Sequence, residues 1–295
     1  MKKIAVSGAG GFLGKHILKK IMETDHIAYA LTSKPHEIGC ELGEQERIIF
    51  VHKDEYADVT WEKIDVLINC AFPRNTDGNM MADGLNYIKN LLSFSVEHGV
   101  KTVINISSQS VYSQKRKEAA TEKTPLDLET KYAVGKYATE LLTNSICKQI
   151  PYSNIRMASL IGVGFEQRIV NKFVRQALEK KELYIKIGSQ KFGFLDVEDA
   201  AEAILQFALS DSKLWQREYN LGGTKIYTLD DIAEAVAKVV ERYSMHKIEI
   251  HREESNDVLN SELDSKMFYE HCKWKPQYTL ENTVKKIYDE MIKRE

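Results

Sequence analysis

The glycine-rich turn near the amino terminus constrains the fold of this chain more than any other feature. A short β-rich run, Lys3–Ser7, leads into Gly8-Ala-Gly-Gly-Phe-Leu-Gly14, after which apolar residues recur at helical spacing. Glycines at these positions allow a tight turn, close approach of a pyrophosphate and close packing of the helix. We therefore predict a dinucleotide-binding turn, with a glycine turn that binds nothing as the alternative. The predicted contacts are Gly8, Gly11, Phe12, Leu13 and Gly14.

The order of the elements that follow predicts the fold class. Apolar runs typical of strands alternate with helical patterns, and they lie near residues 26–31, 48–51, 66–69, 102–106 and 154–157. This order predicts an α/β protein with a Rossmann-type, doubly wound parallel sheet covered on both faces. Residues 1–157 would form the dinucleotide-binding domain. Residues 158–295 would form a smaller C-terminal α/β substrate-binding region, from which the segment at about 190–225 returns to the first domain.

The second half has a less regular pattern. It predicts helices, short strands and a C-terminal helix, near residues 170–179, 184–187, 197–209, 218–221 and 280–292. A further helix should begin after Thr228, because Thr228 and Asp231 have the spacing of a capping box with Asp in place of Glu. No repeat or low-complexity linker interrupts this half.

Composition excludes several classes of protein. Hydrophobic residues make up 43% and charged residues 28%, which is ordinary globular usage, and the net charge of -2 gives no reason to expect a nucleic-acid partner. No run approaches the roughly 20 apolar residues of a membrane span, and no signal-peptide pattern is present, so we expect a cytoplasmic protein. The four cysteines form no Cys-x-x-Cys pair and are expected to be reduced structural thiols, with no metal site.

Tyr132 and Lys136 are the strongest candidates for chemistry. Residues four apart on a helix share a face, so the lysine cation can favour the phenolate of the tyrosine and suit it to proton transfer at a carbinol or carbonyl. A chance pair on a solvated face is the alternative. The strand at 102–106 opens into Ser107–Tyr112, where a hydroxyl would be in reach of a substrate.

The predicted cofactor contacts beyond the glycine turn lie at other strand ends. An NAD site usually has an acidic residue about 20 positions after the glycines, whereas this chain has Thr32, Ser33 and Lys34, which favours NADP with NAD possible. A solvated loop lysine is the alternative. Asp54 could accept from the adenine amino group, or be an ordinary turn aspartate, and Ala71 could line the nicotinamide side.

With these features in place, the sequence resembles the extended short-chain dehydrogenase/reductases over its whole length. The resemblance is to the NAD(P)-dependent epimerase/dehydratase family, which modifies nucleotide sugars. Besides the glycine turn and Tyr132-x-x-x-Lys136, the matching segments are Ser108-Gln-Ser-Val-Tyr112, Thr121-Glu-Lys-Thr-Pro125, Gly193-Phe-Leu-Asp-Val-Glu-Asp199, Tyr219-Asn-Leu-Gly-Gly223, Asp264-Ser-Lys266 and Trp274-Lys-Pro276.

The resemblance implies roles for three residues and a form of assembly. Tyr132 would be the acid/base, Lys136 would hold the nicotinamide ribose and tune Tyr132, and Ser108 would hydrogen-bond the reacting sugar oxygen. It also implies a homodimer, in which the helix near 85–97 and the Tyr132 helix pack against their symmetry mates.

Departures from the family pattern narrow the reaction. Family dehydratases usually carry an acidic pair after the catalytic hydroxyl residue, and Gln109 and Ser110 stand there instead, which disfavours dehydration. Arginines expected to contact nucleotide phosphates are altered, as in Lys191-Phe-Gly193. We therefore expect NADPH-dependent reduction of a 4-keto-6-deoxy nucleotide sugar. The alternatives are a UDP-hexose 4-epimerase, a reductase of a non-sugar carbonyl and a non-catalytic NADP(H) sensor.

Overall fold

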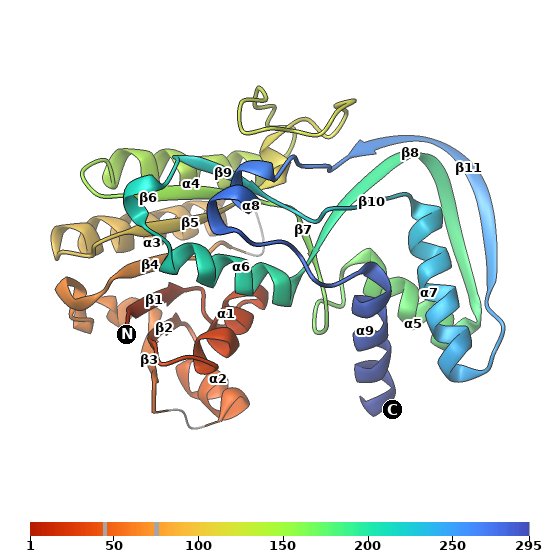
Figure 1. Cartoon of the computed structure of the whole chain (residues 1–295), viewed down its shortest axis with the longest axis horizontal. Coiled ribbons are helices and arrows are strands. Elements are labelled where there is room, and N and C mark those ends of the chain that lie inside the picture. Colours follow the sequence, from red (N-terminus) through yellow and green to blue (C-terminus); the bar gives the residue numbers. More distant parts are fainter. Residues whose placement is uncertain (44–45, 74–76, 295) are drawn as a thin grey trace.

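A computed structural model describes residues 1–43, 46–73 and 77–294, which form two lobes side by side (Figure 1). The sheet lobe contains β1 (Lys3–Ser7), α1 (Phe12–Met22), β2 (Ile27–Thr32), α2 (Pro35–Leu42), β3 (Ile48–His52), β4 (Val66–Asn69), α3 (Gly78–Glu97), β5 (Val103–Ser108), α4 (Lys131–Ile146), β6 (Tyr152–Met157), α6 (Val197–Leu209), β9 (Glu218–Leu221) and α8 (Lys266–Cys272). The ribbon lobe contains β7 (Ser159–Ile161), α5 (Ile169–Lys180), β8 (Glu182–Asp196), β10 (Ile226–Tyr227), α7 (Leu229–Ser244), β11 (Glu249–Asn260) and α9 (Leu280–Arg294).

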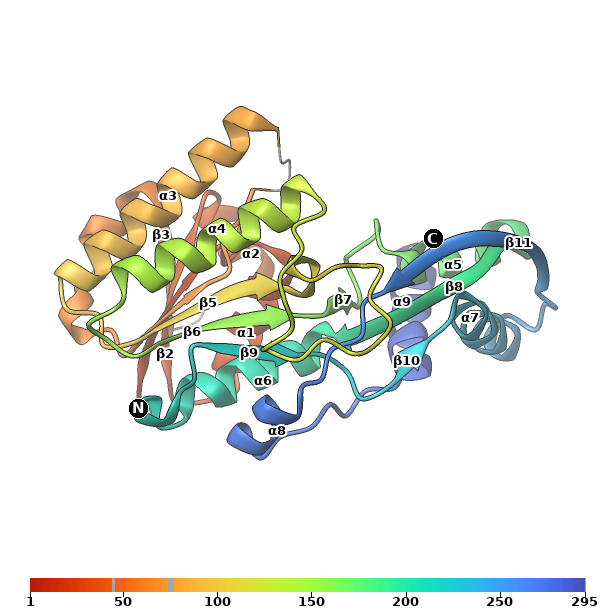
Figure 2. The same ribbon diagram turned by 90° about the horizontal axis from the view of Figure 1, so that it is seen from above.

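The sheet lobe is built on seven strands in the order β3-β2-β1-β4-β5-β6-β9, all parallel to their neighbours. The chain proceeds from β1 to β3 in one direction and from β4 to β6 in the other, so the order reverses between β1 and β4. The helices α3 and α4 cover one face, and α1 and α6 cover the other (Figure 2). This confirms the predicted Rossmann-type sheet, and the reversal is where such sheets bind ligands.

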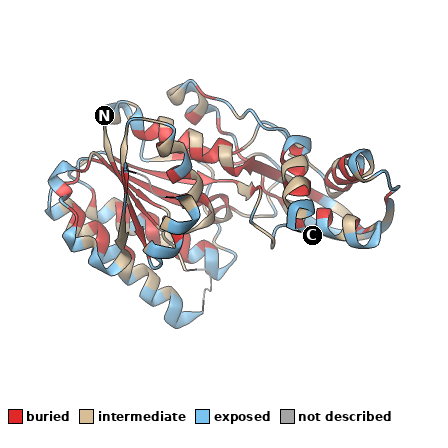
Figure 3. Ribbon diagram, turned by 90° about the horizontal axis from the view of Figure 1, so that it is seen from below, coloured by how far each residue is buried: buried red, intermediate tan, exposed pale blue. Residues whose placement is uncertain are grey.

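The strands of this sheet are almost continuously apolar because both of their faces are covered. Residues Val66–Asn69 and Val103–Ser108 are buried throughout. Figure 3 shows that buried residues predominate in the interior of the sheet lobe, and two hydrophobic clusters lie on the two sides of the sheet. The cores therefore hold the carboxyl ends of β1, β4 and β5 in fixed positions.

The ribbon lobe differs from the sequence expectation. The short strand predicted at 184–187 is part of β8, which has 15 residues and pairs in parallel with the 12-residue β11. No strand was expected at β11, because its charged residues do not alternate with apolar ones. The register shifts between Glu254 and Val258, and there the backbone of Asp257 comes so close to Gly188 that a Cβ atom would clash with it.

Other boundaries agree with the sequence. The helix α6 and the strand β9 have the predicted limits, and the Thr228 capping box is present at the start of α7. The helix α3 begins at Gly78, seven residues before the predicted start at Leu85. The side chain of Asp77 caps it by accepting from the backbone N–H of Met80 at 3.0 Å.

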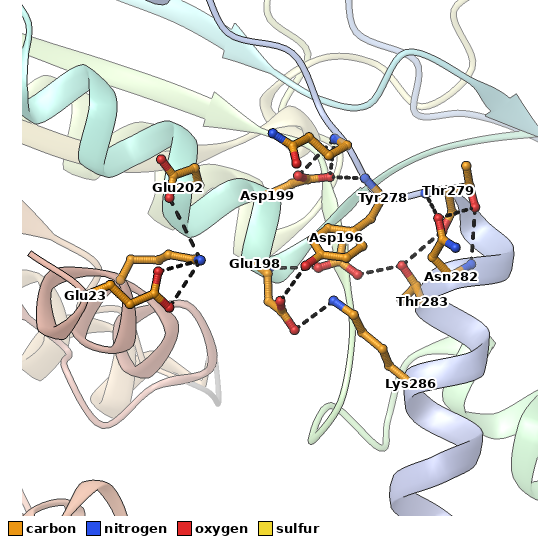
Figure 4. Close-up of polar contacts among 12 residues, drawn as sticks. Glu23, Asp196, Glu198, Asp199, Glu202, Tyr278, Thr279, Asn282, Thr283 and Lys286 are labelled. Atoms are coloured by element: carbon orange, nitrogen blue, oxygen red, sulfur yellow. Dashed lines mark hydrogen bonds and ion pairs between the residues drawn. The ribbon is translucent and has the colours of Figure 1, made fainter.

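A polar cluster at the start of α6 joins the two lobes (Figure 4). Asp199 accepts from the backbone N–H groups of Gln277 and Tyr278, at 3.0 and 2.9 Å, and Asp196 accepts from the hydroxyl of Thr283 at 2.5 Å. Burial raises the pKa of both aspartates. These contacts fix the amino end of α9 against the sheet lobe.

Two further observations bear on the sequence expectations. Within the described ranges, no helix has both the length and the hydropathy that crossing a membrane requires. The four cysteines are free thiols in the structure, and burial raises the pKa of Cys70, Cys147 and Cys272 to about 12.

Candidate active site

The helix α4 brings Tyr132 and Lys136 against the same aromatic ring. Lys136 is buried, its Nζ donates to the carbonyl of Ile106 at 2.9 Å, and it lies 4.5 Å from the centre of the Phe72 ring. Tyr132 is 40% exposed and meets Phe72 edge-on, with the ring centres 5.3 Å apart. The phenol and the ammonium therefore share a face, as their spacing predicts.

Ser108 ends the neighbouring strand β5 and has a defined hydrogen-bonding state. Its Oγ accepts from the backbone N–H and from the hydroxyl of Ser110, at 3.2 and 2.9 Å. Two accepted hydrogen bonds leave the proton of the Ser108 hydroxyl available for donation. Gln109 and Ser110 form a short 3-10 turn with Val111. Both side chains are uncharged, so no carboxylate follows Ser108 directly.

The buried face of α4 is polar, which corrects a sequence expectation. The apolar residues Ala138, Leu142 and Ile146 recur at helical spacing, which predicts that this helix buries them, but they are only half-buried. The buried residues of α4 are Ala133, Gly135, Lys136, Thr139, Glu140 and Thr143. The physical reason is that this face packs on polar side chains of β5 and β6, whereas the expectation assumed an apolar partner.

A buried ion pair is the centre of this polar face. An Nη atom of Arg156 on β6 lies 2.8 Å from a carboxylate oxygen of Glu140, and both side chains are nearly inaccessible. Glu140 also accepts from the hydroxyl of Ser107 at 2.5 Å, and Arg156 donates to the hydroxyl of Tyr112 at 3.0 Å. Arg156, which the sequence analysis did not single out as a contact, therefore holds α4 to the strand ends.

A cavity of about 710 Å³ opens at the carboxyl ends of β1, β2 and β4, next to this helix. Six predicted cofactor contacts line it: Gly8, Gly11, Thr32, Ser33, Lys34 and Ala71. Phe72 lines it too, and so connects the cavity to the Tyr132 and Lys136 pair. Its volume lies within the roughly 300–1,000 Å³ of ligand pockets.

Five predicted contacts lie outside the cavity lining, and one of them is Lys136, which was described above. Leu13 belongs to the core, and the ring of Phe12 packs on Phe165 at 4.6 Å. Gly14 lies so close to the Gly8 carbonyl that no Cβ fits, which is the helix-packing role expected of this glycine. The carboxylate of Asp54 pairs with Lys53 at 2.5 Å on the exposed turn after β3.

The glycine turn fits a dinucleotide phosphate. Gly8 has φ of +71°, and a Cβ atom there would lie 2.7 Å from the backbone nitrogen of Ala71. A Cβ atom at Gly10 would lie 2.7 Å from the hydroxyl oxygen of Thr32. The backbone at the start of α1 is therefore free of side chains, as close approach of a pyrophosphate requires.

Arg168 lies near the candidate catalytic tyrosine and was missed from the sequence. It precedes α5 in the ribbon lobe, its guanidinium lies 4.7 Å from the centre of the Phe165 ring, and it interacts electrostatically with the Tyr132 phenol. Nothing in the spacing of residues 158–168 relates this arginine to Tyr132, because their proximity arises from the packing of the two lobes.

One group of metal-ligating side chains occurs among the residues described, and it is separate from this site. Glu182, Glu249 and His251 lie together on the surface of the β8–β11 pair, at least partly exposed. None of the three lines the cavity beside the glycine turn.

Comparison with known proteins agrees with this fold. The chain is 26% identical to an uncharacterized UDP-glucose epimerase of Bacillus subtilis over 247 residues, which cover 76% of this chain and 77% of that protein. The structure of a UDP-glucuronic acid 4-epimerase from Bacillus cereus, in complex with UDP-glucuronic acid and NAD, superimposes with a TM-score of 0.83 at 20% identity, covering 99% and 100% of the two chains. A dTDP-glucose 4,6-dehydratase from Bacillus anthracis, in complex with NAD, gives 0.82 at 19% identity, covering 100% and 98%.

The sequence profile of the NAD dependent epimerase/dehydratase family matches residues 4–222, which is more than half of the chain. The solved structures similar to this chain include a 4-epimerase and a 4,6-dehydratase, each in complex with NAD. By the match of the family profile, the chain belongs to the NAD dependent epimerase/dehydratase family and is an enzyme that uses a nicotinamide cofactor.

Proposed function

We propose that this protein is a nucleotide-sugar 4-epimerase. The observation that carries the proposal is the arrangement of Tyr132 and Lys136 against Phe72 at the edge of the cavity, next to the strand that ends in Ser108. The absence of a carboxylate at positions 109 and 110 disfavours dehydration. The relatives reported above are epimerases and a dehydratase, so they favour epimerisation over the ketoreductase that the sequence predicts first.

The residues of the chain divide the chemistry between them. Tyr132 would remove the proton from the C4 hydroxyl of the sugar and later return it. Ser108 would donate its remaining proton to the same oxygen, since its lone pairs are occupied by Ser110. A bound nicotinamide ring would supply the acceptor and donor of the C4 hydride. Return of the hydride to the opposite face of the sugar gives the epimer.

The positive charges around Tyr132 suit this role. Lys136 is held by one hydrogen bond to the Ile106 carbonyl and by the Phe72 ring, so its other two N–H groups are available to a ribose or to the phenol. Arg168, which comes from the other lobe, interacts electrostatically with the Tyr132 side chain. Positive charge close to an oxygen that loses its proton stabilises the anion during proton transfer.

A product assay with two arms tests the proposal. The purified protein is incubated with UDP-glucose, UDP-N-acetylglucosamine and UDP-glucuronic acid without added cofactor. In parallel, 4-keto-6-deoxy sugars on thymidine, guanosine and cytidine diphosphates are offered with NADPH. We expect a 4-epimer of at least one UDP sugar and no loss of NADPH absorbance. Consumption of NADPH without any epimer would favour the ketoreductase.

We also propose that the enzyme is a homodimer that pairs through α3 and α4. Three large apolar side chains, Met80, Val134 and Leu141, are exposed on these two helices, which pack side by side. A symmetric helix-pair interface would cover them. Light scattering at micromolar concentration should give twice the mass of one chain, and a monomeric mass would contradict this assembly.

A further inference from the structure

The cavity beside the glycine turn does not include the candidate catalytic residues in its lining. Ser108, Tyr132 and Lys136 are absent from the lining that the structure describes, whereas Phe72 belongs to it and contacts both Tyr132 and Lys136. Phe72 follows shortly after the end of β4, so it stands where the cavity meets the helix α4. The contacts of this ring therefore bear on how the catalytic pair is held.

The Phe72 ring supports the Lys136 ammonium in a buried place. Lys136 is 5% exposed, its Nζ donates to the Ile106 carbonyl at 2.9 Å, and the same Nζ lies 4.5 Å from the centre of the ring. The Cys70 thiol, which also interacts with Lys136, is uncharged at neutral pH because burial raises its pKa to about 12. A buried ammonium needs compensating contacts, and the face of an aromatic ring supplies negative electrostatic potential. The ring is therefore a substantial part of what holds this cation.

The same ring contacts the phenol of Tyr132. The two ring centres are 5.3 Å apart and the planes are nearly perpendicular, at 87°, which is a favourable arrangement for an aromatic pair. Tyr132 lies in the first turn of α4 and is 40% exposed, so little surrounding core fixes its side chain. Phe72 therefore restricts where the phenol lies relative to Lys136.

The backbone of α4 is shaped to receive the ring. A Cβ atom at Gly135 would lie 2.8 Å from Cζ of Phe72 and 2.5 Å from the end of the Met81 side chain. Glycine inside a helix is less stable than alanine, so α4 forgoes a side chain at the place where the ring packs. Three residues of one helix, Tyr132, Gly135 and Lys136, thus fix the position of Phe72, and Phe72 in turn fixes the two that carry chemistry.

We propose that Phe72 is a positioning residue for the reaction. The face of its ring holds the Lys136 ammonium, its perpendicular contact holds the Tyr132 phenol, and Phe72 acts on the substrate and the cofactor only through these two residues. The proposal rests on the proposed function in assigning proton transfer to Tyr132, and it holds for any sugar that the enzyme accepts.

Phe72→Leu in the full-length protein tests the proposal, because it keeps an apolar side chain and removes the ring. Turnover per folded molecule should fall about tenfold, the size expected when a desolvated cation loses a ring face. The acidic limb of the pH–rate profile should move to higher pH, because positive charge near an oxygen stabilises it as it loses its proton. Titration calorimetry should show that NAD⁺ binding weakens by roughly threefold to tenfold, since Lys136 is expected to hold the nicotinamide ribose.

Two further variants separate positioning from packing. Met81→Leu is the matched control, because Met81 packs on Gly135 beside Phe72 without a ring, and it should change turnover and NAD⁺ affinity by less than about twofold. Gly135→Ala should displace the ring from the other side and reproduce the losses of Phe72→Leu. The two losses should not add in the double variant, because both act through the position of one ring.

The outcomes that would overturn the proposal are specific. They are unchanged turnover, pH profile and NAD⁺ affinity in folded Phe72→Leu, an equal effect of Met81→Leu, or fully additive losses in the double variant. A wild-type protein that epimerises no sugar would contradict the proposed function instead, and the NAD⁺ affinities of the same variants would still decide whether Phe72 positions Lys136.

Discussion

The helices α4 and α7 are matched in length and differ in what they bury. Each has 16 residues and begins after a threonine whose side chain caps it, Thr130 and Thr228. The buried face of α7 is wholly apolar and lies in the core of the ribbon lobe. The buried face of α4 includes Lys136, Thr139, Glu140 and Thr143. Charged residues are almost never fully buried unless paired, so the face of α4 serves more than packing.

The position of α4 suggests what that polar face does. Glu140 is one turn after Lys136, and it is held by Arg156 and by Ser107, the neighbour of Ser108. An apolar interface would let a helix adjust its position at small cost, whereas these directional contacts fix it in one place. We interpret the polar face as the means by which Tyr132 and Lys136 are positioned relative to Ser108. Substitutions on the two helices should separate this positioning role of α4 from the packing role of α7.

Removal of the Tyr132 hydroxyl should have the largest effect on rate. Tyr132→Phe should reduce turnover by about a hundredfold to ten-thousandfold, because proton transfer by a positioned side chain contributes that much. The dinucleotide affinity of Tyr132→Phe should be nearly unchanged. Lys136→Met, in contrast, should lose both turnover and dinucleotide affinity. Steady-state kinetics and titration calorimetry measure the two quantities. A variant that keeps more than a tenth or so of the wild-type rate would show that Tyr132 is not the acid/base.

Loss of the buried ion pair should affect stability and activity together. Glu140→Gln leaves the Arg156 guanidinium buried without a counter-charge, so it should lower the free energy of unfolding by about 3–5 kcal/mol. Denaturant titration measures this loss, and kinetics on the remaining folded protein should show reduced turnover. If folded Glu140→Gln turns over at the wild-type rate, Glu140 has a structural role only.

A cavity in the core around α7 should affect stability alone. Ile232 is fully buried, and Ile232→Ala should lower the free energy of unfolding by about 2–5 kcal/mol. Turnover per folded molecule should stay close to wild type, because α7 takes no part in the described site. A large fall in turnover at full folding would remove the distinction between the two helices.

The sequence predicted the parts of the site that local patterns encode. The glycine turn, the end of β5 and the spacing of Tyr132 and Lys136 each lie within a few residues, so their geometry follows from strand and helix periods. The roles of Glu140 and Arg168 could not be predicted from local patterns. Glu140 pairs with Arg156 and Arg168 interacts with Tyr132, and in each case the two residues come from different segments of the chain. The strand β11 was missed because its charged residues do not alternate with apolar ones.

Removal of a helix cap should have the smallest effect on stability, and the effects at the two helices should be similar. Thr130 accepts from the backbone N–H of Ala133, and Thr228 accepts from that of Asp231, both at 3.1 Å. Thr130→Ala and Thr228→Ala should each cost about 1 kcal/mol, the typical value of an N-cap. The Thr228 change should be the larger, because the Thr228 hydroxyl also donates to the carboxylate of Asp231, at 2.7 Å. Thermal unfolding measures both losses of stability. A loss in Thr130→Ala several times that in Thr228→Ala would mean that α4 depends on its cap for its stability.

The fate of the hydrogen at C4 of the sugar tests the central claim most directly. A UDP sugar that the enzyme converts is prepared with deuterium at C4 and incubated in ordinary water, and the product is examined by mass spectrometry and NMR. Epimerisation at the proposed site predicts an epimer that retains the deuterium at C4, because the hydride leaves and returns within one turnover. Loss of the deuterium to solvent, or its accumulation in free reduced dinucleotide, would contradict the account.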